Sequence, residues 1–356
     1  MKPPRSVSPA AALFAVALLP FPRVALAWSR LGHQTIGQIA QDQLKNASDP
    51  ASQTALASVK TLLNTSSDQA LADLAPCADS LRAQPASPPM PATPTKPASP
   101  GYPGINPGDP VKCGGLDLVA NSESAPWHFI NIPLTAQAAP GSVSAYCPGG
   151  ACVVDEIKRN VQVLSDGSAS VSDKQIALMY LSHFVGDEHQ PLHCTTEIVD
   201  GQDDRGGNGK PVKLDGTQLN LHALWDHQIE VKDDYPVDLS ALESMPGDAD
   251  QWAQGDFVTA AAVESFTIGK DTIYPSYYQA AAAAADHVPD YGAAYQTQMQ
   301  AITNKRLQMA GFRLAALIKQ ALGGQPLSAS ASKAPASNDP LETPKRKVSA
   351  VIKSAN

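Results

Sequence analysis

The sequence predicts an all-α fold, a single-domain helical bundle with long loops. Apolar residues recur at spacings of three and four through most of the chain, as in amphipathic helices. Only Pro211 to Leu214 and its surroundings look briefly extended. In chain order, the helices that this spacing predicts are Thr35 to Leu44, Ala51 to Leu63, Val154 to Leu164, Asp173 to Gln190, His222 to Lys232, Asp250 to Phe266, Tyr277 to His287 and Tyr291 to Leu322. Gly323-Gly324 then predicts the end of the last helix.

Residues 1–27 have the pattern of a secretory signal peptide. Lys2 and Arg5 make the start positive, and Ala10 to Leu19 form an apolar run too short to span a bilayer. Ala25-Leu26-Ala27 fits the small-x-small cleavage pattern, and cleavage there would make Trp28 the first residue of the mature protein. We therefore expect an exported protein, either periplasmic or secreted.

Residues 28–323 are predicted to form one domain between the signal peptide and the tail. About 295 residues are enough for a single large domain with a sizeable core. Segment 83–110 has frequent prolines from Pro85 onward, which predicts a polyproline-like surface insertion. It interrupts the domain rather than dividing it, because candidate metal ligands lie on both sides. Residues 324–356 are rich in Ser, Ala, Pro and Lys and are predicted to be a disordered tail.

The charge of the chain is acidic and argues against a basic nucleic-acid-binding patch. The formal net charge is −8, and removing Lys2, Arg5 and Arg23 with the signal peptide lowers it to −11. A protein this acidic would need bound cations to hold phosphates. After the signal peptide, no segment approaches the roughly 18 apolar residues that a membrane helix needs.

An exported protein can keep disulfides, and this chain has five cysteines. Cys147 and Cys152 close a short Pro-Gly-Gly loop and are expected to pair, as are Cys77 and Cys113. Cys194 is left over. A buried free thiol is the favoured interpretation, and a thiolate zinc ligand is the alternative.

Two His-x-x-x-Asp pairs suggest a polynuclear zinc site. His183 and Asp187 form the first pair, and His193 follows shortly after it. His222 and Asp226 form the second. On a helix, residues four apart share one face, so each pair presents an imidazole and a carboxylate to the same point.

Three further candidates lie earlier in the chain. His33 follows the predicted new N-terminus, Asp79 lies in Cys77-Ala78-Asp79-Ser80-Leu81-Arg82, and His128 lies in Trp127-His128-Phe129-Ile130-Asn131. Singly, His33 could be a helix-start residue and Asp79 an exposed charge. Together with the two pairs they favour a metal centre, because burying so many titratable groups without metal would be costly.

These residues, with Asn220-Leu221-His222-Ala223-Leu224-Trp225-Asp226, resemble the zinc-dependent single-strand nucleases of the S1/P1 type. The resemblance runs from Trp28 to about Leu322 and includes Lys305-Arg306-Leu307 and residues 310–315 in the last helix. We expect a bacterial-type member. The resemblance implies the trinuclear-zinc fold shared with phospholipase C, and an endonuclease that acts on single-stranded DNA and RNA, and on nucleotides. It implies 5′-phosphorylated products, with 3′-nucleotidase activity as a further expectation, and we expect a monomer.

The resemblance also implies three Zn²⁺ ions per chain and their ligands. The buried ion would be held by Asp79, His128, His183 and Asp187. Its close neighbour would be held by the Trp28 amine and carbonyl, His33, and Asp187 as a bridge, and the third ion by His193, His222 and Asp226. Pro191 is expected to end the preceding helix and let His193 turn toward the third ion.

On the substrate side, the resemblance implies catalytic roles for Asp187 and Asn131 and substrate contacts for Phe129, Asn208 and Gln228. Phe129 would stack on a base, with core packing as the alternative, and Asn208 could instead belong to a plain Gly-rich turn. Two residues depart from the family pattern. Asn131 stands where aspartate is frequent, and Gln228 stands where asparagine is frequent.

Two other functions remain open at this point. A zinc-dependent phospholipase C also starts at Trp and has a similar His-x-x-x-Asp…His run, but resembles His-x-x-x-Glu where this chain has His222 and Asp226. An exported zinc-storing protein would instead have saturated coordination and no turnover. His189 is expected to be a supporting or surface histidine, and Trp225 a core residue.

Overall fold

The computed structural model of the chain describes residues 28–82, 110–119, 121–228, 239–245 and 249–324. The predicted signal peptide therefore lies outside the described residues, as do nearly all of the proline-rich insertion and of the tail. Within the described part, helices dominate and the strands are short, which confirms the predicted all-α class. The α-helices are α1 (Arg30–Asn46), α2 (Pro50–Leu62), α3 (Ala70–Leu74), α4 (Cys77–Leu81), α5 (Val153–Ser165), α6 (Val171–His189), α7 (Leu221–Ala223), α8 (Leu239–Ser244), α9 (Ala249–Trp252), α10 (Phe257–Ile268), α11 (Tyr274–Ala283) and α12 (Ala293–Leu322).

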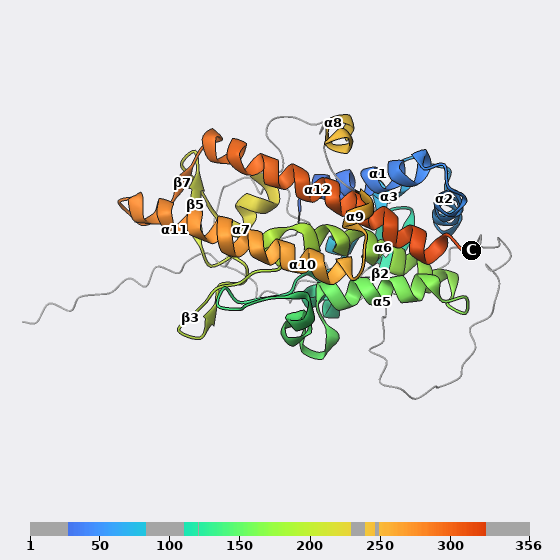
Figure 1. Ribbon diagram of the computed structural model, residues 1–356, viewed down its shortest axis with the longest axis horizontal. Helices are drawn as coiled ribbons and strands as arrows, with labels where there is room; N and C mark the ends of the chain where they lie inside the picture. Colours follow the sequence, from blue (N-terminus) through green and yellow to red (C-terminus); the bar gives the residue numbers. More distant parts are fainter. Residues whose placement is uncertain (1–27, 83–109, 120, 229–238, 246–248, 325–356) are drawn as a thin grey trace, which may run out of the picture.

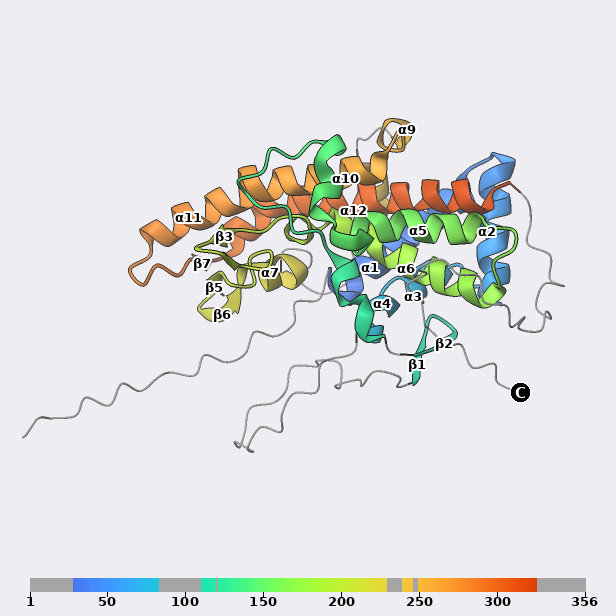
Figure 2. The same ribbon diagram turned by 90° about the horizontal axis from the view of Figure 1, so that it is seen from below.

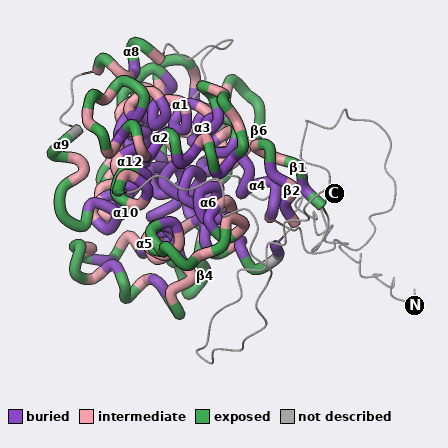
Figure 3. Tube along the Cα trace, turned by 90° about the vertical axis from the view of Figure 1, so that its right-hand side faces the viewer, coloured by how far each residue is buried: buried purple, intermediate pink, exposed green. Residues whose placement is uncertain are grey.

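Helix α6 forms the centre of the bundle. It packs against α1, α5, α10 and α12, and α12 runs along the long axis of the molecule (Figure 1). Every residue of α6 from Ile176 to His189 is buried, whereas its first turn includes the exposed Asp173. Figure 3 shows α6 amid buried chain, with the other helices around it. A helix covered on all sides can carry polar side chains only where they find partners, so the His and Asp residues of α6 need an internal explanation.

The two ends of α6 follow from local sequence. The Ser170 hydroxyl caps its first turn by accepting a hydrogen bond of 3.1 Å from the backbone N–H of Asp173. Pro191 lies two residues after its last residue, His189, and cannot continue the helix. The chain then forms a short 3₁₀ turn, η4 (Pro191–His193), which redirects His193 as predicted.

Three small sheets flank the bundle. The predicted extended segment is β5 (Pro211–Leu214), which pairs with β6 (Thr217–Asn220) and β7 (Asp290–Tyr291). These strands lie with α11 at the end of the molecule opposite α2 (Figures 1 and 2). The other strands were not predicted: β1 (Pro110–Cys113) pairs with β2 (Leu116–Val119), and β3 (Ile198–Val199) pairs with β4 (Gln202–Asp203).

Two helix predictions need correction. The segment Asp250 to Phe266 is two helices, because Gly255 adopts the left-handed φ of 62° and Asp256 then caps α10 at Thr259. The long last helix begins at Ala293 rather than Tyr291, which belongs to β7.

The remaining differences are local. The predicted helix at His222 is the short α7 followed by a π-helical turn, η5 (Leu224–Gln228), and residues 229–232 lie outside the described part. Helix α11 begins and ends earlier than the predicted Tyr277 to His287. The short helices α3, α4 and α8 were not predicted. The remaining turns are η1 (Ser122–His128), η2 (Pro140–Tyr146), η3 (Pro148–Gly150) and η6 (Gly269–Ile273).

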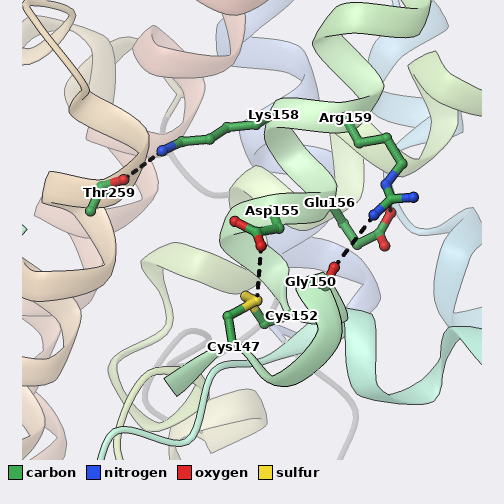
Figure 4. Close-up of a disulfide and its surroundings, with 8 residues drawn as sticks. All are labelled: Cys147, Gly150, Cys152, Asp155, Glu156, Lys158, Arg159 and Thr259. Carbon is green, nitrogen blue, oxygen red and sulfur yellow. Dashed lines mark hydrogen bonds and ion pairs between the residues drawn. A yellow bond between two sulfur atoms is a disulfide. The ribbon is translucent and has the colours of Figure 1, made fainter. Parts of the chain in front are cut away.

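Both predicted disulfides are present in the structure. Cys77 of α4 pairs with Cys113 of β1, and Cys147 pairs with Cys152. Figure 4 shows the second disulfide beside Asp155, whose Oδ2 lies 3.3 Å from the sulfur of Cys147. Cys194 is free and buried, as favoured by the sequence.

The apolar interior has two parts. The larger cluster includes Trp28, Ile36 and Phe184, and the smaller one includes Leu192 and Trp225. Trp225 is fully buried, which confirms that it is a core residue. Among the described helices, none combines the length and the apolar character needed to cross a bilayer.

Candidate metal centre

The predicted ligand side chains form three groups inside the protein. In each group, one ligand atom per residue lies within 4.8 Å of the others, and all of these residues are buried. The groups are His33, His183 and Asp187; Asp79, His128 and His183; and His193, His222 and Asp226. The first two groups share His183 and are joined further by Asp187, so they form a continuous cluster.

The innermost part of the cluster surrounds the His183 imidazole. Its Nε2 lies 3.2 Å from Asp187 Oδ2, 3.6 Å from Asp79 Oδ1 and 3.2 Å from His128 Nδ1. His128 Nδ1 is in turn 2.8 Å from Asp187 Oδ2. Helix α6 supplies His183 and Asp187 on one face, α4 supplies Asp79, and the end of η1 supplies His128.

His33 extends the cluster from α1. Its Nε2 lies 3.4 Å from Asp187 Oδ1, and its ring stacks on that of His183 with centroids 3.8 Å apart. Gly186 permits this approach, because a Cβ atom at that position would lie 2.9 Å from His33 Nδ1. Asp187 therefore has one oxygen facing His33 and the other facing His128 and His183, which is the arrangement that a bridging carboxylate requires.

The third group lies beyond the end of α6. His222 Nε2 is 3.5 Å from Asp226 Oδ2, and the His193 and His222 rings have centroids 5.0 Å apart. Gln190 donates from Nε2 to Asp226 Oδ1 at 2.6 Å, so it fixes the orientation of this carboxylate.

Backbone carbonyls hold three of the histidines through their Nδ1–H groups. His183 donates to Ala75 O at 2.8 Å, His193 to His128 O at 2.7 Å, and His222 to Gly206 O at 2.7 Å. Each bond fixes the ring and turns its Nε2 atom toward its ligand group. Metal-binding histidines are commonly oriented in this way.

Buried polar atoms without hydrogen-bond partners indicate whether a cation fits the cluster. The buried nitrogen and oxygen atoms of the ligand groups that have no hydrogen-bond partner within the described structure include His33 Nδ1 and Nε2, Asp79 Oδ1, His128 Nε2, Asp187 Oδ1 and His193 Nε2. Leaving such atoms unsatisfied costs free energy, and bound cations would offset that cost. Imidazole nitrogens and carboxylate oxygens are also the donors that zinc accepts.

At most histidine positions of the cluster, the electrostatics favour the neutral imidazole, which can bind a metal ion. Burial, reinforced by neighbouring positive groups, lowers the pKa of His33 to about 3 and that of His128 to about 4. Burial also lowers the pKa of His193. These imidazoles are therefore neutral near pH 7, which is the form that binds metals.

The two carboxylates of the cluster favour the protonated, positively charged form of His183. Burial acts to raise the pKa values of Asp79 and Asp187, but His183 outweighs it and both pKa values fall below the usual range. Burial acts to lower the pKa of His183, but Asp187 and Asp79 raise it to about 10. The two carboxylates thus stabilise positive charge at the centre of the cluster.

Trp28 lies against this centre. Its side chain is fully buried, and its Nε1 donates to Gly186 O at 2.9 Å. The next residue, Ser29, donates its backbone N–H to Asp226 O at 2.9 Å. The start of the described chain is therefore tied both to the residue before Asp187 and to the third group.

The residues predicted to contact the substrate differ in exposure and in their contacts. Phe129 and Asn131 are partly exposed, and Phe129 belongs to neither apolar cluster. Asn208 is partly buried and donates from Nδ2 to Arg205 O at 2.8 Å, a contact within its own loop. The side chain of Gln228 lies outside the described part.

The sequence did not reveal two supporting side chains, Gln190 and Asp203. Gln190 precedes Pro191 and binds Asp226, and Asp203 accepts a hydrogen bond of 3.1 Å from Asn131 Nδ2. A buried polar residue next to the helix-ending proline was the available signal for Gln190. No sequence pattern pointed to Asp203.

Two other predicted residues do not face the metal groups. His189 is buried, with Nδ1 2.7 Å from Val185 O and Nε2 2.9 Å from Arg313 Nη1, so both ring nitrogens bind protein atoms. It supports the helix end rather than an ion. Cys194 donates its thiol to Glu188 O at 3.4 Å, and burial raises the pKa of that thiol well above its usual value. Within the described structure it belongs to none of the candidate ligand groups.

Comparison with known proteins identifies related sequences. Residues 28–323 match the family model described as S1/P1 Nuclease. The chain is 26% identical to Nuclease S1 of Aspergillus oryzae over 63% of this chain and 60% of that protein. It is 29% identical to Endonuclease 2 of Arabidopsis thaliana, over 61% of each chain, and 27% identical to Nuclease P1 of Penicillium citrinum, over 64% of each. The matched region thus spans somewhat under two thirds of these relatives.

Proposed function

The chain belongs to the S1/P1 nuclease family, and from that premise we propose that it is an exported, zinc-dependent endonuclease. It hydrolyses single-stranded DNA and RNA to 5′-phosphorylated products and has 3′-nucleotidase activity on nucleotides. The observation that carries the proposal is the set of three buried ligand groups, which contain nitrogen and oxygen atoms without hydrogen-bond partners. Names such as Nuclease P1 and Endonuclease 2 among the relatives support the reaction class.

In this proposal the cluster holds three zinc ions. Asp79, His128, His183 and Asp187 hold the innermost ion, and His193, His222 and Asp226 hold the third. The Trp28 amine and carbonyl, His33 and Asp187 hold the remaining one. When bound, such ions lower the pKa of water towards 7 and polarise phosphoryl oxygens.

The chain's own residues orient the ligands and receive the substrate. Asp187 joins the two parts of the cluster with its separate oxygens, and the carbonyl bonds of His183, His193 and His222 keep their rings aligned. Buried protein walls exclude bulk water from the ligand atoms, which strengthens electrostatic interactions with a phosphodiester. Asn131, partly exposed in the segment that follows His128, cannot serve as a base, so in this proposal the bound ions activate the water.

Preference for single strands follows from the partly exposed Phe129 beside His128. An aromatic ring can stack on any base, but only on one that has left its duplex neighbours. Sequence preference is therefore slight. Cations in the cluster also reconcile phosphate binding with the acidic charge of the chain, since no basic groove is needed.

Export is supported by two observations. The sequence begins with a signal-peptide pattern, and both predicted disulfides form in the structure, which suits an oxidising compartment. Processing has a chemical role in this proposal. An amide nitrogen is a poor zinc ligand, so Trp28 joins the site only after cleavage frees its amine.

The test uses protein processed to begin at Trp28. We expect it to contain three zinc ions by elemental analysis, to cleave single-stranded DNA and RNA, and to leave phosphatidylcholine intact. Asp187→Asn should abolish cleavage, whereas His287→Gln, at an exposed histidine outside the ligand groups, should leave it unchanged. Zinc-loaded protein without nuclease activity would overturn the proposal, and phosphatidylcholine hydrolysis would favour the phospholipase instead.

A further inference from the structure

Three chain segments meet at the innermost ligand group, and helix α6 provides only one of them. Asp79 comes from α4 and His128 from the end of η1, and both lie near His183 of α6. Asp79 Oδ1 lies 3.6 Å from His183 Nε2 and 3.8 Å from His128 Nδ1. The segments are far apart in the sequence. The geometry of the group therefore depends on what fixes α4 and η1 relative to each other.

Helix α4 is too short to fix its own position. It has five residues, and no side chain within the described structure caps its first turn. An isolated helix of this length is unstable in water, because fixing the first turn costs more free energy than so few hydrogen bonds contribute. Residues 83–109, which follow shortly after it, lie outside the described part. Contacts with neighbouring segments must therefore hold α4 in place.

The β1–β2 hairpin and Asn121 hold α4 at its two ends. Cys113, the last residue of β1, forms a disulfide with Cys77, the first residue of α4. At the other end, Asn121 N donates to Leu81 O at 2.8 Å. Asn121 is also the N-cap of η1, the turn that ends at His128. Figures 2 and 3 show the hairpin beside α4, where it connects the segments that carry two of the ligands.

Cys77 lies midway between two residues that contact His183. Two residues before it, Ala75 O accepts a hydrogen bond of 2.8 Å from His183 Nδ1. Two residues after it, Asp79 directs Oδ1 toward Nε2 of the same ring. Residues 75–79 therefore face both nitrogens of one imidazole, and the disulfide fixes the middle of this stretch. A shift of Cys77 would move both contacts.

The turn of the hairpin packs closely against the chain just before α4. Gly114 has a left-handed φ of 58°, and a Cβ atom there would lie 2.7 Å from Leu74 Cδ1. Glycine suits both the conformation and the close approach. Cys113, next to Gly114, is thereby held near Cys77, with their Cα atoms 5.6 Å apart.

We propose that Cys77 and Cys113 are positioning residues of the metal centre, whose disulfide fixes Asp79 relative to His128 as a ligand of the innermost ion. This inference rests on the proposed zinc-dependent function and gives one of the two disulfides a role in it. A cross-link between residues 36 apart also restricts the unfolded chain, and so stabilises the fold in general. The positioning role differs from that general effect because it acts through Asp79.

The experiment removes each disulfide in turn. Cys77→Ala/Cys113→Ala and Cys147→Ala/Cys152→Ala are compared with the wild type. Elemental analysis measures zinc content, and competition with a chelator measures the affinity for each ion. Without the Cys77–Cys113 disulfide, binding of one zinc ion should weaken roughly ten- to a hundredfold. Without the Cys147–Cys152 disulfide, zinc should bind as in the wild type, because neither cysteine belongs to an element that supplies the three ligand groups.

A second comparison separates positioning from general stability. Asp79→Asn is introduced into the wild type and into Cys77→Ala/Cys113→Ala. If the disulfide acts through Asp79, its removal should weaken zinc binding by less than about threefold once this carboxylate is gone. Urea unfolding of metal-free protein should show a loss of stability in both backgrounds, because restriction of the unfolded chain does not depend on Asp79.

Reduction of folded protein gives the same information if Cys77→Ala/Cys113→Ala does not fold. The zinc-loaded Cys147→Ala/Cys152→Ala protein keeps only the Cys77–Cys113 disulfide. A water-soluble trialkylphosphine converts that bond into two thiols and becomes the phosphine oxide, with the oxygen supplied by water. Thiol counting measures the extent of reduction. One zinc ion should become accessible to a chelator as the bond is reduced.

Three results would overturn the inference. These are wild-type zinc affinity in Cys77→Ala/Cys113→Ala or in fully reduced protein, equal losses of zinc affinity in the two cysteine double variants, and an undiminished effect of the disulfide in the Asp79→Asn background. A wild type that binds no zinc would instead overturn the proposed function, and this inference with it.

Discussion

The indole Nε1 of Trp28 donates a hydrogen bond of 2.9 Å to the carbonyl oxygen of Gly186. This bond joins the first residue after the predicted cleavage site to the residue that precedes Asp187. The buried side chain therefore anchors the Trp28 backbone beside the carboxylate that faces both parts of the cluster. Small changes at the new N-terminus should consequently alter metal binding at this centre.

One added residue before Trp28 should remove one zinc ion. An alanine placed there converts the terminal amine into an amide, while the indole bond to Gly186 can still form. We expect zinc content to fall from about three to two per chain and kcat to fall roughly a hundredfold or more. Elemental analysis measures the zinc content and a DNA-cleavage assay measures kcat, with protein beginning at Trp28 as the control. Equal zinc and equal turnover in the two proteins would contradict the role of the amine.

Chelation should destabilise the fold as well as inactivate it. Metal ions that bind only the folded state stabilise it. Without them, buried nitrogen and oxygen atoms of the cluster lack partners. EDTA should lower the melting temperature by more than about 5 °C. The Asp187→Asn variant serves as the control, since it should start from a lower melting temperature and shift less. An unchanged wild-type melting temperature would show that the fold does not depend on metal.

Asp49 should make stability depend on pH at the start of α2. Its side chain caps the helix through Ser52 and lies 3.0 Å from Lys319 Nζ, and these contacts lower its pKa from 3.8 to about 2. A carboxyl group whose pKa is lowered by folding stabilises the protein above its unfolded pKa, and this contribution is lost as the pH falls toward 2. Asp49→Asn keeps a capping oxygen but removes the charge.

Urea unfolding of metal-free protein isolates this effect, because metal release then contributes nothing. Wild type should be more stable than Asp49→Asn at pH 6, and the difference should shrink steadily between pH 4 and pH 2. A difference that stays constant with pH would exclude the charge as its cause.

The closeness of the side chains within each His-x-x-x-Asp pair could be predicted because it depends on local spacing, whereas the wider ligand set was expected from the family resemblance. His183 and Asp187 share a face of α6 through helical geometry alone, and Pro191 marks where the chain must turn. The central helices were predictable for the same reason, since their apolar spacing reflects the faces they bury. The sequence also indicated that the two cysteines nearest in the chain, Cys147 and Cys152, would pair.

What escaped prediction depends on contacts between distant segments. Asp203 meets Asn131 only because the β3–β4 hairpin folds back across 72 residues of chain, and two-residue strands leave almost no periodic signal. The division of Asp250 to Phe266 was missed for a different reason. Apolar spacing continues across Gly255, and only the backbone shows its left-handed φ.

Gln190 should hold the third ligand group together. Its Nε2 donates to Asp226 Oδ1 at 2.6 Å, and its Oε1 accepts the N–H of Leu192 at 2.6 Å. Gln190→Leu removes one buried hydrogen bond from each partner, which should cost about 1–3 kcal/mol of unfolding free energy. Because Asp226 is also freed to rotate, we expect weaker binding of one zinc ion, by roughly ten- to a hundredfold.

A second glutamine separates these two effects. Gln175 also donates from its amide, to Leu62 O at 2.6 Å, but lies at the far end of α6 from the third group. Gln175→Leu should lose some stability and keep full zinc affinity. Urea unfolding together with competition against a zinc chelator distinguishes the variants. If Gln190→Leu retained wild-type affinity for all of its zinc, the orientation of Asp226 would not depend on this side chain.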